Sequence, residues 1–217
     1  MIFHCFQRLH AADNASNRCY YAVTGAILQF FAFHLMPWDR LPADFDQKYD
    51  SAWTWLPNSL YDPRHGVELY NRYLDELVLA EHLGFDGVCV NEHHQNAYGL
   101  MPSPQLMAST LARRTRNASI LLLGQSLALY DPPTRVAEEM AMIDCISGGR
   151  LIAGFPVGTP MDTCYAYGQN PAQLRDRYYE GIDLVLQHIP GAADPLAESH
   201  DWYVLLEWSS TRPRRST

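Results

Sequence analysis

The sequence predicts an α/β protein built on a parallel β-sheet, and two kinds of pattern lead to this prediction. Short apolar runs rich in β-forming residues, at residues 85–90, 119–123 and 151–155, have the length of buried strands. Longer segments between them place apolar residues every three or four positions, as amphipathic helices do. Strands that alternate with helices form parallel sheets, and such a sheet is either open or closed into a barrel.

The expected helices are bounded by residues that usually begin or end helices. The first covers residues 67–83, with helical spacing of Leu69, Tyr73 and Leu77. The other boundary residues are Gly84 after this helix, Ser103 or Ser109 before the second, Pro132 and Pro133 before the third, Gly148 and Gly149 after the third, and Pro171 before the fourth. The middle of the chain therefore contains repeated strand–helix units.

Composition limits the classes of protein that fit. The chain has 217 residues, of which 47% are hydrophobic, so it can bury a sizeable core. Its formal net charge of -8 disfavours a nucleic-acid partner, because phosphate binding needs a basic face. The three arginines of the last six residues indicate a solvated tail rather than a nucleic-acid contact.

The cysteine pattern predicts free thiols in a reducing, cytoplasmic setting. There is no C-x-x-C spacing, so neither a disulfide framework nor a zinc knuckle is expected. No H-x-x-x-H or H-E-x-x-H motif is present either, and we expect no metal. The five cysteines are Cys5, Cys19, Cys89, Cys145 and Cys164.

One segment has two interpretations. Residues 20–36 are largely apolar and approach the length of about 20 residues that a membrane span needs. Gln29 and His34 interrupt the apolar run, and a basic start with a small-residue cleavage site is not clear. A buried strand at residues 29–35, preceded by an unrelated extension, is the interpretation we favour, so we expect no membrane association.

The most chemically pointed motif is Asn91-Glu92-His93-His94, which follows a predicted strand. Reactive groups gather at the carboxyl ends of strands in parallel α/β proteins. A histidine beside a carboxylate has the ingredients of a general acid or base. Adjacent residues of an extended chain point to opposite sides, so one histidine is expected to face the reactive edge. A polar loop that only caps the strand is the alternative.

Two further strand ends carry small residues that suit a bound cofactor. Gly154 to Gly158 form a Gly/Pro turn whose backbone can approach a ligand closely. Gly124, Gln125 and Ser126 continue the strand at 119–123, where small and amide side chains suit the face of a planar group. A turn without a ligand and a plain strand end are the alternative interpretations.

Three runs of the chain resemble the bacterial luciferase-like monooxygenase family. Residues 80–94 (AEHLGFDGVCVNEHH) resemble the second strand of that family, and residues 98–104 (YGLMPSP) and 135–151 (RVAEEMAMIDCISGGRL) follow in the same order. The resemblance covers roughly residues 30–188. It implies a TIM (β/α)8-type barrel that binds reduced FMN, or a deazaflavin in some relatives, and uses O2 to oxidise a small organic substrate.

The resemblance also implies roles for single residues. His93 matches the catalytic histidine of the family, with Glu92 and His94 as its neighbours. The implied cofactor contacts are Met36 after the first strand, Gln125 and Ser126 beside the flavin ring, and Gly154, Val157 and Gly158 in the turn beside the flavin phosphate. Luciferase-type members commonly carry arginine where this chain has Val157, so backbone N–H groups are expected to bind the phosphate.

Length departs from the family pattern. A complete barrel needs roughly 250 residues, whereas this chain has four strand–helix units and a candidate fifth strand at 202–206. We therefore expect a barrel truncated to four or five βα units in residues 29–188. Residues 1–28 form an unmatched extension and residues 189–217 an irregular tail. A fragment, or an altered reading frame with foreign sequence at both ends, would account for this organisation.

Three functions follow from these observations. The first is a flavin-dependent monooxygenase supplied by a flavin reductase, with a homodimer as one way to complete the open sheet. The second is a catalytically inactive flavin-binding fragment or degenerate relative. The third is a membrane-anchored interaction fragment that uses residues 20–36. The long aromatic loop at 37–65 either roofs a pocket for an apolar or aromatic substrate or packs over the barrel mouth.

Overall fold

The computed structural model describes residues 29–54, 56–158 and 161–188, together with three short strands nearer the N-terminus. These are β1 (Phe3–Phe6), β2 (Ala22–Val23) and β3 (Ala26–Ile27). Side chains are described within residues 29–54, 56–158 and 161–185. The basic tail and the candidate strand at 202–206 lie outside the described residues.

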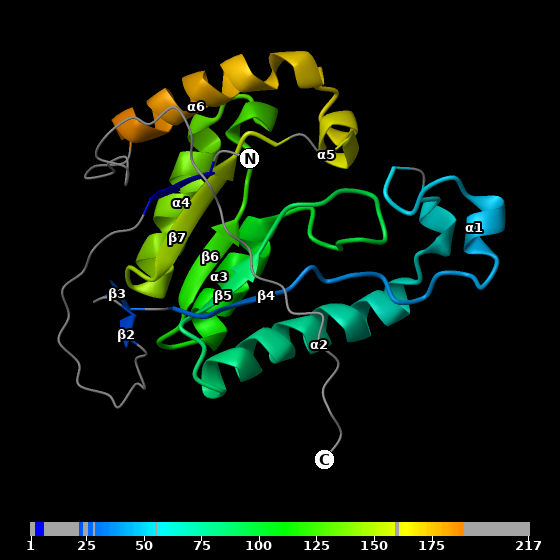
Figure 1. Ribbon diagram of the computed structural model, residues 1–217, viewed down its shortest axis with the longest axis horizontal. Helices are drawn as coiled ribbons and strands as arrows, with labels where there is room; N and C mark the ends of the chain where they lie inside the picture. The colour runs from blue at the N-terminus through cyan, green and yellow to red at the C-terminus, as the bar shows by residue number, and fades with distance from the viewer. Residues whose placement is uncertain are drawn as a thin grey trace.

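Four parallel strands form the centre of the fold. They are β4 (Phe31–Phe33), β5 (Gly87–Val90), β6 (Ser119–Leu123) and β7 (Leu151–Pro156). Each strand pairs in parallel with the next one in the sequence, and the strands stand side by side in chain order (Figure 1). This arrangement confirms the predicted α/β fold with a parallel sheet and matches consecutive units of a barrel wall.

A fifth strand joins the sheet from the N-terminal extension. Strand β1 pairs antiparallel with β7 at the edge of the sheet, while β2 and β3 form a separate two-stranded ribbon. Sequence periodicity predicted no strand before residue 29. In the structure β1 occupies the edge where a barrel would place its next parallel strand.

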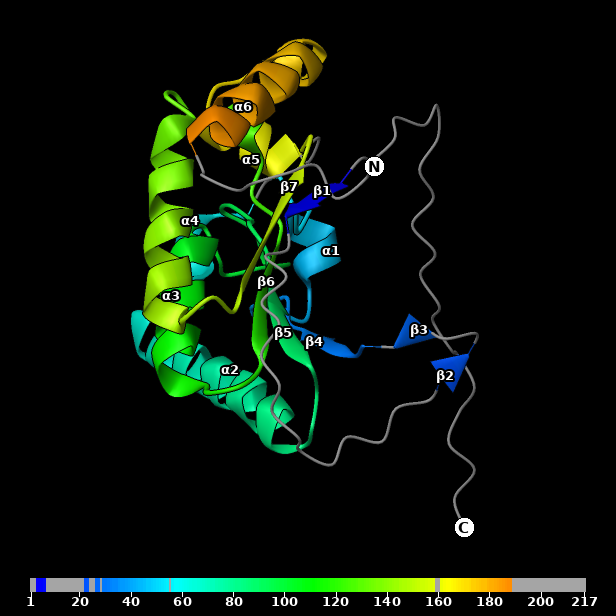
Figure 2. The same ribbon diagram turned by 90° about the vertical axis from the view of Figure 1, so that its left-hand side faces the viewer.

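Helices cover one face of the sheet (Figure 2). The connecting helices are α2 (Pro63–His82), α3 (Pro104–Arg114) and α4 (Thr134–Ser147). Helix α6 (Leu174–His188) packs against the 3-10 turn η2 (Leu127–Leu129). The shorter elements are α1 (Phe45–Lys48), η1 (Asn58–Leu60), α5 (Met161–Ala166) and η3 (Pro171–Gln173).

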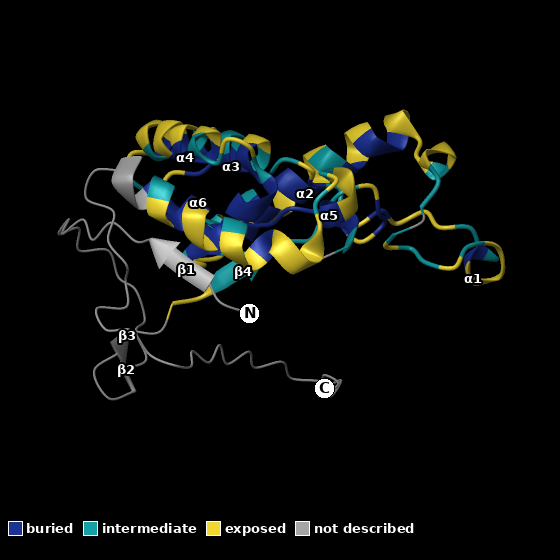
Figure 3. Ribbon diagram, turned by 90° about the horizontal axis from the view of Figure 1, so that it is seen from above, coloured by how far each residue is buried: buried dark blue, intermediate teal, exposed yellow. Residues whose placement is uncertain are grey.

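The two faces of β6 differ in burial, whereas β5 is buried on both faces. Ile120 and Leu122 of β6 are fully buried in the core beneath the helices. The residues that alternate with them, Leu121 and Leu123, are only partly buried because they point to the other face. Figure 3 shows the matching pattern on the helices, whose outer surfaces are exposed. The side of β6 that faces away from the helices is therefore less well covered than the side beneath them.

The helix start and stop signals predicted most boundaries. Ser103 rather than Ser109 caps α3, and Gly148 ends α4 with a left-handed φ of 72°. Helix α2 begins at Pro63 rather than at residue 67, because the Asp62 side chain caps it. Pro171 begins the 3-10 turn that leads into α6.

Two strands are shorter than predicted. The strand expected at 29–35 covers only Phe31–Phe33, because the backbone turns where Met36 adopts a positive φ of 53°. The strand expected at 85–90 begins at Gly87, because the Asp86 carboxylate accepts a hydrogen bond from the Phe30 N–H at 2.9 Å. Neither the positive φ of Met36 nor the long-range Asp86–Phe30 hydrogen bond is visible in hydrophobic periodicity.

Arg150 joins three segments of the helical layer. Replacing Arg150 is therefore expected to lower the free energy of unfolding substantially. Its guanidinium donates to the carbonyls of Ala112, Thr115, Ala118 and Ser147, and to the Thr115 hydroxyl. Burial lowers the pKa of Arg150 from its usual range. We expect Arg150→Met to lower the free energy of unfolding by about 3 to 5 kcal/mol, since it strands several buried carbonyls.

Denaturant unfolding followed by circular dichroism measures this loss. Arg135→Met is the matched control, because Arg135 is exposed and pairs with Glu139 along the surface of α4. The control should change the free energy of unfolding by less than about 0.5 kcal/mol. Equal effects of the two substitutions would contradict a structural role for Arg150.

The remaining expectations concern cysteines, metals and membranes. Cys145 and Cys164 are free thiols, as predicted, and Cys89 forms no disulfide bond; Cys5 and Cys19 lie where side chains are not described. Within the described ranges, no three His, Cys, Asp or Glu side chains are grouped as metal ligands are. No helix in that part of the chain is long and apolar enough to cross a membrane.

Candidate active site

The three motifs singled out in the sequence follow neighbouring strands. Asn91 to His94 follow β5, Gly124 to Ser126 follow β6, and Val157 and Gly158 follow β7. Because these strands are parallel and paired in register, their carboxyl ends lie along one edge of the sheet. The structure thus gathers the predicted residues into one region.

His93 is held by a carboxylate that is distant in sequence. Its Nδ1 lies 3.1 Å from Oδ2 of Asp162, which comes from α5, 69 positions further along the chain. Both side chains are buried. The Tyr98 ring packs edge-on against the imidazole at 4.9 Å. Two contacts therefore fix the imidazole plane.

Asp162 accepts hydrogen bonds from four donors of the site. Its Oδ2 receives the His94 backbone N–H at 3.0 Å and the Asn96 amide at 2.9 Å, besides His93. Its Oδ1 receives the Trp53 indole N–H at 3.0 Å. Burial alone would raise the pKa of Asp162, but the bonds from His93 and the His94 N–H outweigh it and lower the pKa. Asp162 is therefore ionised near neutral pH.

An ionised Asp162 fixes the tautomer of His93. A carboxylate only accepts hydrogen bonds, so Nδ1 must carry the proton that it donates. In the neutral imidazole, Nε2 is then the nitrogen with the free lone pair. The arrangement suits a general base whose orientation is set by a buried carboxylate.

His94 has a carboxylate of its own. Its Nε2 lies 2.9 Å from Oε1 of Glu92, which also accepts the Tyr130 hydroxyl at 3.0 Å. Burial and the nearby Glu92 carboxylate raise the pKa of Tyr130 far above its usual range, so Tyr130 remains a donor. The Tyr167 ring lies 5.2 Å from both the His94 and Tyr130 rings, and burial raises the pKa of Tyr167 to about 12.

The two histidines line different cavities. His93 lines a cavity beside the loop at 37–65, whereas His94 and Asp162 line a second cavity of about 190 Å³. This agrees with the expectation that adjacent residues face different sides. Glu92, which is next to His93 in the sequence, pairs instead with His94, and Asp162 takes the corresponding place at His93.

Several buried polar atoms at the strand ends have no hydrogen-bond partner among the described residues. They are Nε2 and Oε1 of Gln125, Oε2 of Glu92 and Oδ1 of Asn91. Gln125 is entirely buried. An unpaired buried polar atom costs about 1 to 3 kcal/mol, so a cluster of them is a candidate place for a polar ligand or ordered water.

The turn after β7 is tied to the end of β6. The Ser126 hydroxyl donates to the Val157 carbonyl at 2.7 Å, and the Gln125 N–H donates to the Gly154 carbonyl at 3.0 Å. Gly158 has a φ of 73°, and a Cβ there would lie 2.6 Å from the Ser126 side chain. Only glycine fits this position, so the predicted residues of β6 and β7 form one compact surface.

Met36 follows strand β4, and its surroundings are apolar, unlike those of the polar residues at the other strand ends. Its side chain is fully buried in the hydrophobic core. Its carbonyl accepts the Leu100 N–H at 2.8 Å, and the Trp38 N–H donates to the Ala97 carbonyl at 2.9 Å. Met36 thus holds the loop after β4 against the loop after β5.

Sequence reasoning missed Asp162, Tyr130 and Tyr167. Asp162 lies just beyond the Gly/Pro turn that follows β7, so extending the strand-end search past that turn would have included it. The two tyrosines follow β6 and α5 without any motif. Their roles depend on tertiary contacts with Glu92 and His94.

Comparison with known proteins identifies the family. The luciferase-like monooxygenase family model matches residues 54–206, which is more than half of the chain. An uncharacterised protein of Sinorhizobium fredii is 35% identical over 130 residues, covering 58% of this chain and 37% of its own length. The 4-hydroxyprotoasukamycin monooxygenase of Streptomyces nodosus is 32% identical over 146 residues, covering 65% and 39%.

Solved structures share the fold. The oxygenating constituent of 3,6-diketocamphane monooxygenase from Pseudomonas putida, solved with FMN, has a TM-score of 0.56 at 19% identity, covering 72% of this chain and 38% of that one. An F420-dependent secondary alcohol dehydrogenase solved with an F420–acetone adduct has a TM-score of 0.52 at 18% identity, covering 81% and 46%. The chain spans about two fifths of the length of the curated relatives described above. On the family model and its ordered motifs, the chain belongs to the luciferase-like monooxygenase family.

Proposed function

We propose that the carboxyl edge of β5, β6 and β7 is the flavin-binding edge of an oxidoreductase that uses O2 to oxidise a small organic substrate. One observation carries the proposal: the buried, unpartnered polar atoms of Gln125, Glu92 and Asn91 lie at the same strand ends as the His93–Asp162 pair. Residues 29–188 are the proposed extent of this domain.

The residues present fit a flavin at this edge. The polar edge of a flavin ring contains both an N–H donor and carbonyl acceptors, and the Gln125 amide can pair with both. Gly154 lies against the Leu122 carbonyl and Gly158 against the Ser126 side chain, so these glycines hold the ends of β6 and β7 close together, and Ser126 fixes the adjoining turn. Val157 carries no charge, so we propose that backbone N–H groups of this turn bind the phosphate.

His93 is the proposed acid–base residue and Asp162 its positioning residue. Bound reduced flavin supplies the reaction with oxygen. The protein positions the substrate, excludes water and moves a proton at Nε2 of His93. Glu92, Tyr130 and His94 form a second hydrogen-bonded set that holds the strand end in place.

The proposed partners follow from the relatives. The diketocamphane protein is named as an oxygenating constituent in complex with FMN, so we propose FMN as the cofactor and a separate flavin reductase as its donor. The F420-dependent dehydrogenase makes a deazaflavin the alternative cofactor. Association with a second copy is proposed because one face of the sheet is only partly covered within the described residues.

FMN titration tests the flavin edge through Gln125. We expect saturable quenching of FMN fluorescence by the unaltered chain, and an affinity about tenfold weaker or more in Gln125→Leu, since two buried hydrogen bonds are lost. The same substitution should leave stability unchanged or raise it, because leucine removes two unpaired polar atoms. If Gln125 had only a structural role, Gln125→Leu would lower the stability of the fold and leave the FMN affinity unchanged.

Gln173→Leu serves as the control for this titration, because Gln173 is an exposed amide in η3. Its FMN affinity should match that of the unaltered chain. If FMN binds with the same affinity to Gln125→Leu, the flavin edge is misplaced. If FMN binds but no substrate is oxidised with reduced FMN and O2, the second hypothesis, a flavin-binding protein without turnover, replaces the first.

A further inference from the structure

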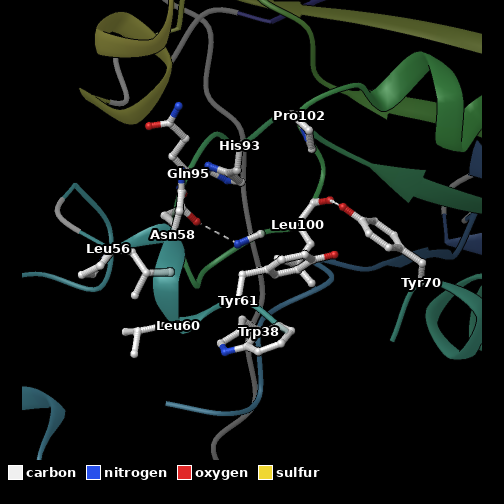
Figure 4. A pocket seen from close by; sticks show the side chains of 13 residues that line it. Trp38, Leu56, Asn58, Leu60, Tyr61, Tyr70, His93, Gln95, Leu100 and Pro102 are labelled. Carbon is white, nitrogen blue, oxygen red and sulfur yellow. Dashed lines mark hydrogen bonds between the residues drawn. The ribbon is translucent and has the colours of Figure 1, made fainter. Parts of the chain in front are cut away.

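A cavity of about 170 Å³ lies beside His93, outside the cluster of unpartnered polar atoms. Its walls come from the loop at 37–65, the first part of α2 and the loop after β5. Figure 4 shows His93 on one side of the cavity and Trp38 on the other, with Tyr61 and Leu100 between them. The principal apolar walls are Trp38, Leu56, Leu60, Tyr61, Tyr70 and Leu100.

Packing contacts and hydrogen bonds hold the aromatic side chains of this cavity in place. The Trp38 ring packs against Tyr61 at 5.1 Å and against His65 at 5.2 Å. Trp38 is buried, and its indole N–H donates to the Arg40 carbonyl at 3.0 Å. The Tyr70 hydroxyl donates to the Leu100 carbonyl. The ring faces, rather than the polar ends of Trp38 and Tyr70, are thus left to contact a ligand.

The polar lining contains no charge other than what His93 can carry. Among the described residues, none that lines the cavity is Asp, Glu, Lys or Arg. The Asn96 amide is already engaged, since it donates to Asp162 and accepts from the backbone N–H groups of Tyr98 and Gly99. Asn58 and Gln95 are exposed at the opening. His93 and the Tyr61 hydroxyl are therefore the polar side-chain groups that a bound molecule would meet.

We propose that this cavity binds a neutral organic molecule with a single six-membered ring, whose hydroxyl group donates a hydrogen bond to Nε2 of neutral His93 or whose carbonyl oxygen accepts one from Nε2 of protonated His93. This names a substrate class for the proposed function and rests on it. An apolar cavity of about 150 Å³ accepts benzene, so about 170 Å³ suits one ring with a small polar substituent. Because the cavity is open to solvent on one side, any further part of a bound molecule would extend outward from the ring.

Neutrality follows from the lining. An ionised ligand would lose its hydration on entering and would meet no opposite charge among the cavity residues except a protonated His93. A neutral ring instead gains by covering the faces of Trp38, Tyr61 and Tyr70. Benzoate and phenol are close in shape but differ in charge at neutral pH, so they separate these effects.

Ligand-observed NMR titration of the full chain at pH 7.5, without flavin, tests the proposal. We expect phenol to bind saturably. Benzoate should bind with an affinity at least about tenfold weaker, because its charge is unpaired in the cavity. Leu60→Trp should abolish phenol binding by filling the cavity. Leu79→Trp is the matched control, because Leu79 is exposed on α2 and does not line the cavity.

The outcomes distinguish this inference from the proposed function. Equal affinity for phenol and benzoate in the unaltered chain, or phenol binding retained in a folded Leu60→Trp, would overturn the substrate class. The phenol–benzoate comparison needs no variant, so misfolding of Leu60→Trp leaves it intact. Phenol binding without FMN binding would contradict the proposed function but not this inference. Flavin-dependent turnover without a preference for phenol over benzoate would contradict this inference but not the proposed function.

Discussion

His93→Gln is expected to lower turnover with reduced flavin and O2 by about a hundredfold to ten-thousandfold, the usual contribution of a general acid or base. Glutamine keeps much of the size of the side chain but cannot take up a proton at Nε2. FMN affinity should remain within about twofold, because the proposed ring contacts come from Gln125 rather than from His93. Steady-state oxidation and FMN titration of the same preparation measure the two effects.

His82→Gln is the control for this substitution, since His82 is exposed at the end of α2. It should retain full turnover. Loss of FMN binding in His93→Gln together with loss of turnover would place His93 in the cofactor site instead. Unchanged turnover would remove His93 from the chemistry altogether.

Asp162→Asn is the second substitution with a large expected effect. Four donors converge on the Asp162 carboxylate, so an amide at this position must point its NH2 group at one of them. If that NH2 group meets His93, the imidazole takes the other tautomer and Nε2 carries the proton. Turnover is expected to fall about a hundredfold or more, as it does when a histidine base loses its orienting carboxylate.

The pH profile separates this positioning role from a merely structural one. Turnover of Asp162→Asn should depend on pH differently from that of the unaltered chain, because the Asp162 carboxylate that accepts from His93 is gone. Asp162→Glu should recover part of the activity, whereas Asp183→Asn, an exposed substitution on α6, should change neither rate nor profile. An unchanged profile with a uniformly lower rate would indicate only a structural role.

Stability in acid gives an independent check on Asp162. The folded protein holds the pKa of Asp162 below its ordinary value of 3.8. The ionised group therefore stabilises the fold above about pH 4, and this contribution disappears as the pH falls through the lowered pKa. Acid unfolding of Asp162→Asn should lack that part of the pH dependence. The same slope in both proteins would contradict an ionised, hydrogen-bonded Asp162.

Much of the fold and part of the site followed from local sequence patterns. Strands and helices appeared as periodic runs, and Ser103 and Gly148 marked helix ends because capping depends on adjacent residues. The strand-end rule located His93 and Gln125 without any knowledge of their contacts. These features depend on nearby residues, which is why one sequence was enough to predict them.

The remainder depends on tertiary contacts. The Asp162–His93 pair joins α5 to the end of β5, and α5 is too short to show helical periodicity. The partner of Glu92 was also ambiguous, because only the fold decides whether His93 or His94 turns toward it. The antiparallel β1 arises from pairing with β7 rather than from any pattern in the extension. Such contacts are set by the whole chain.

Oxygen incorporation tests the central claim most directly. The full chain, FMN and a flavin reductase with its reductant are incubated under ¹⁸O2 with neutral single-ring ketones, alkenes and alcohols, and the products are analysed by mass spectrometry. We predict a product carrying one ¹⁸O atom, formed in the presence of the chain and strongly reduced in His93→Gln. No product above the protein-free control, in a sample shown to bind FMN, would contradict a monooxygenase function for this chain.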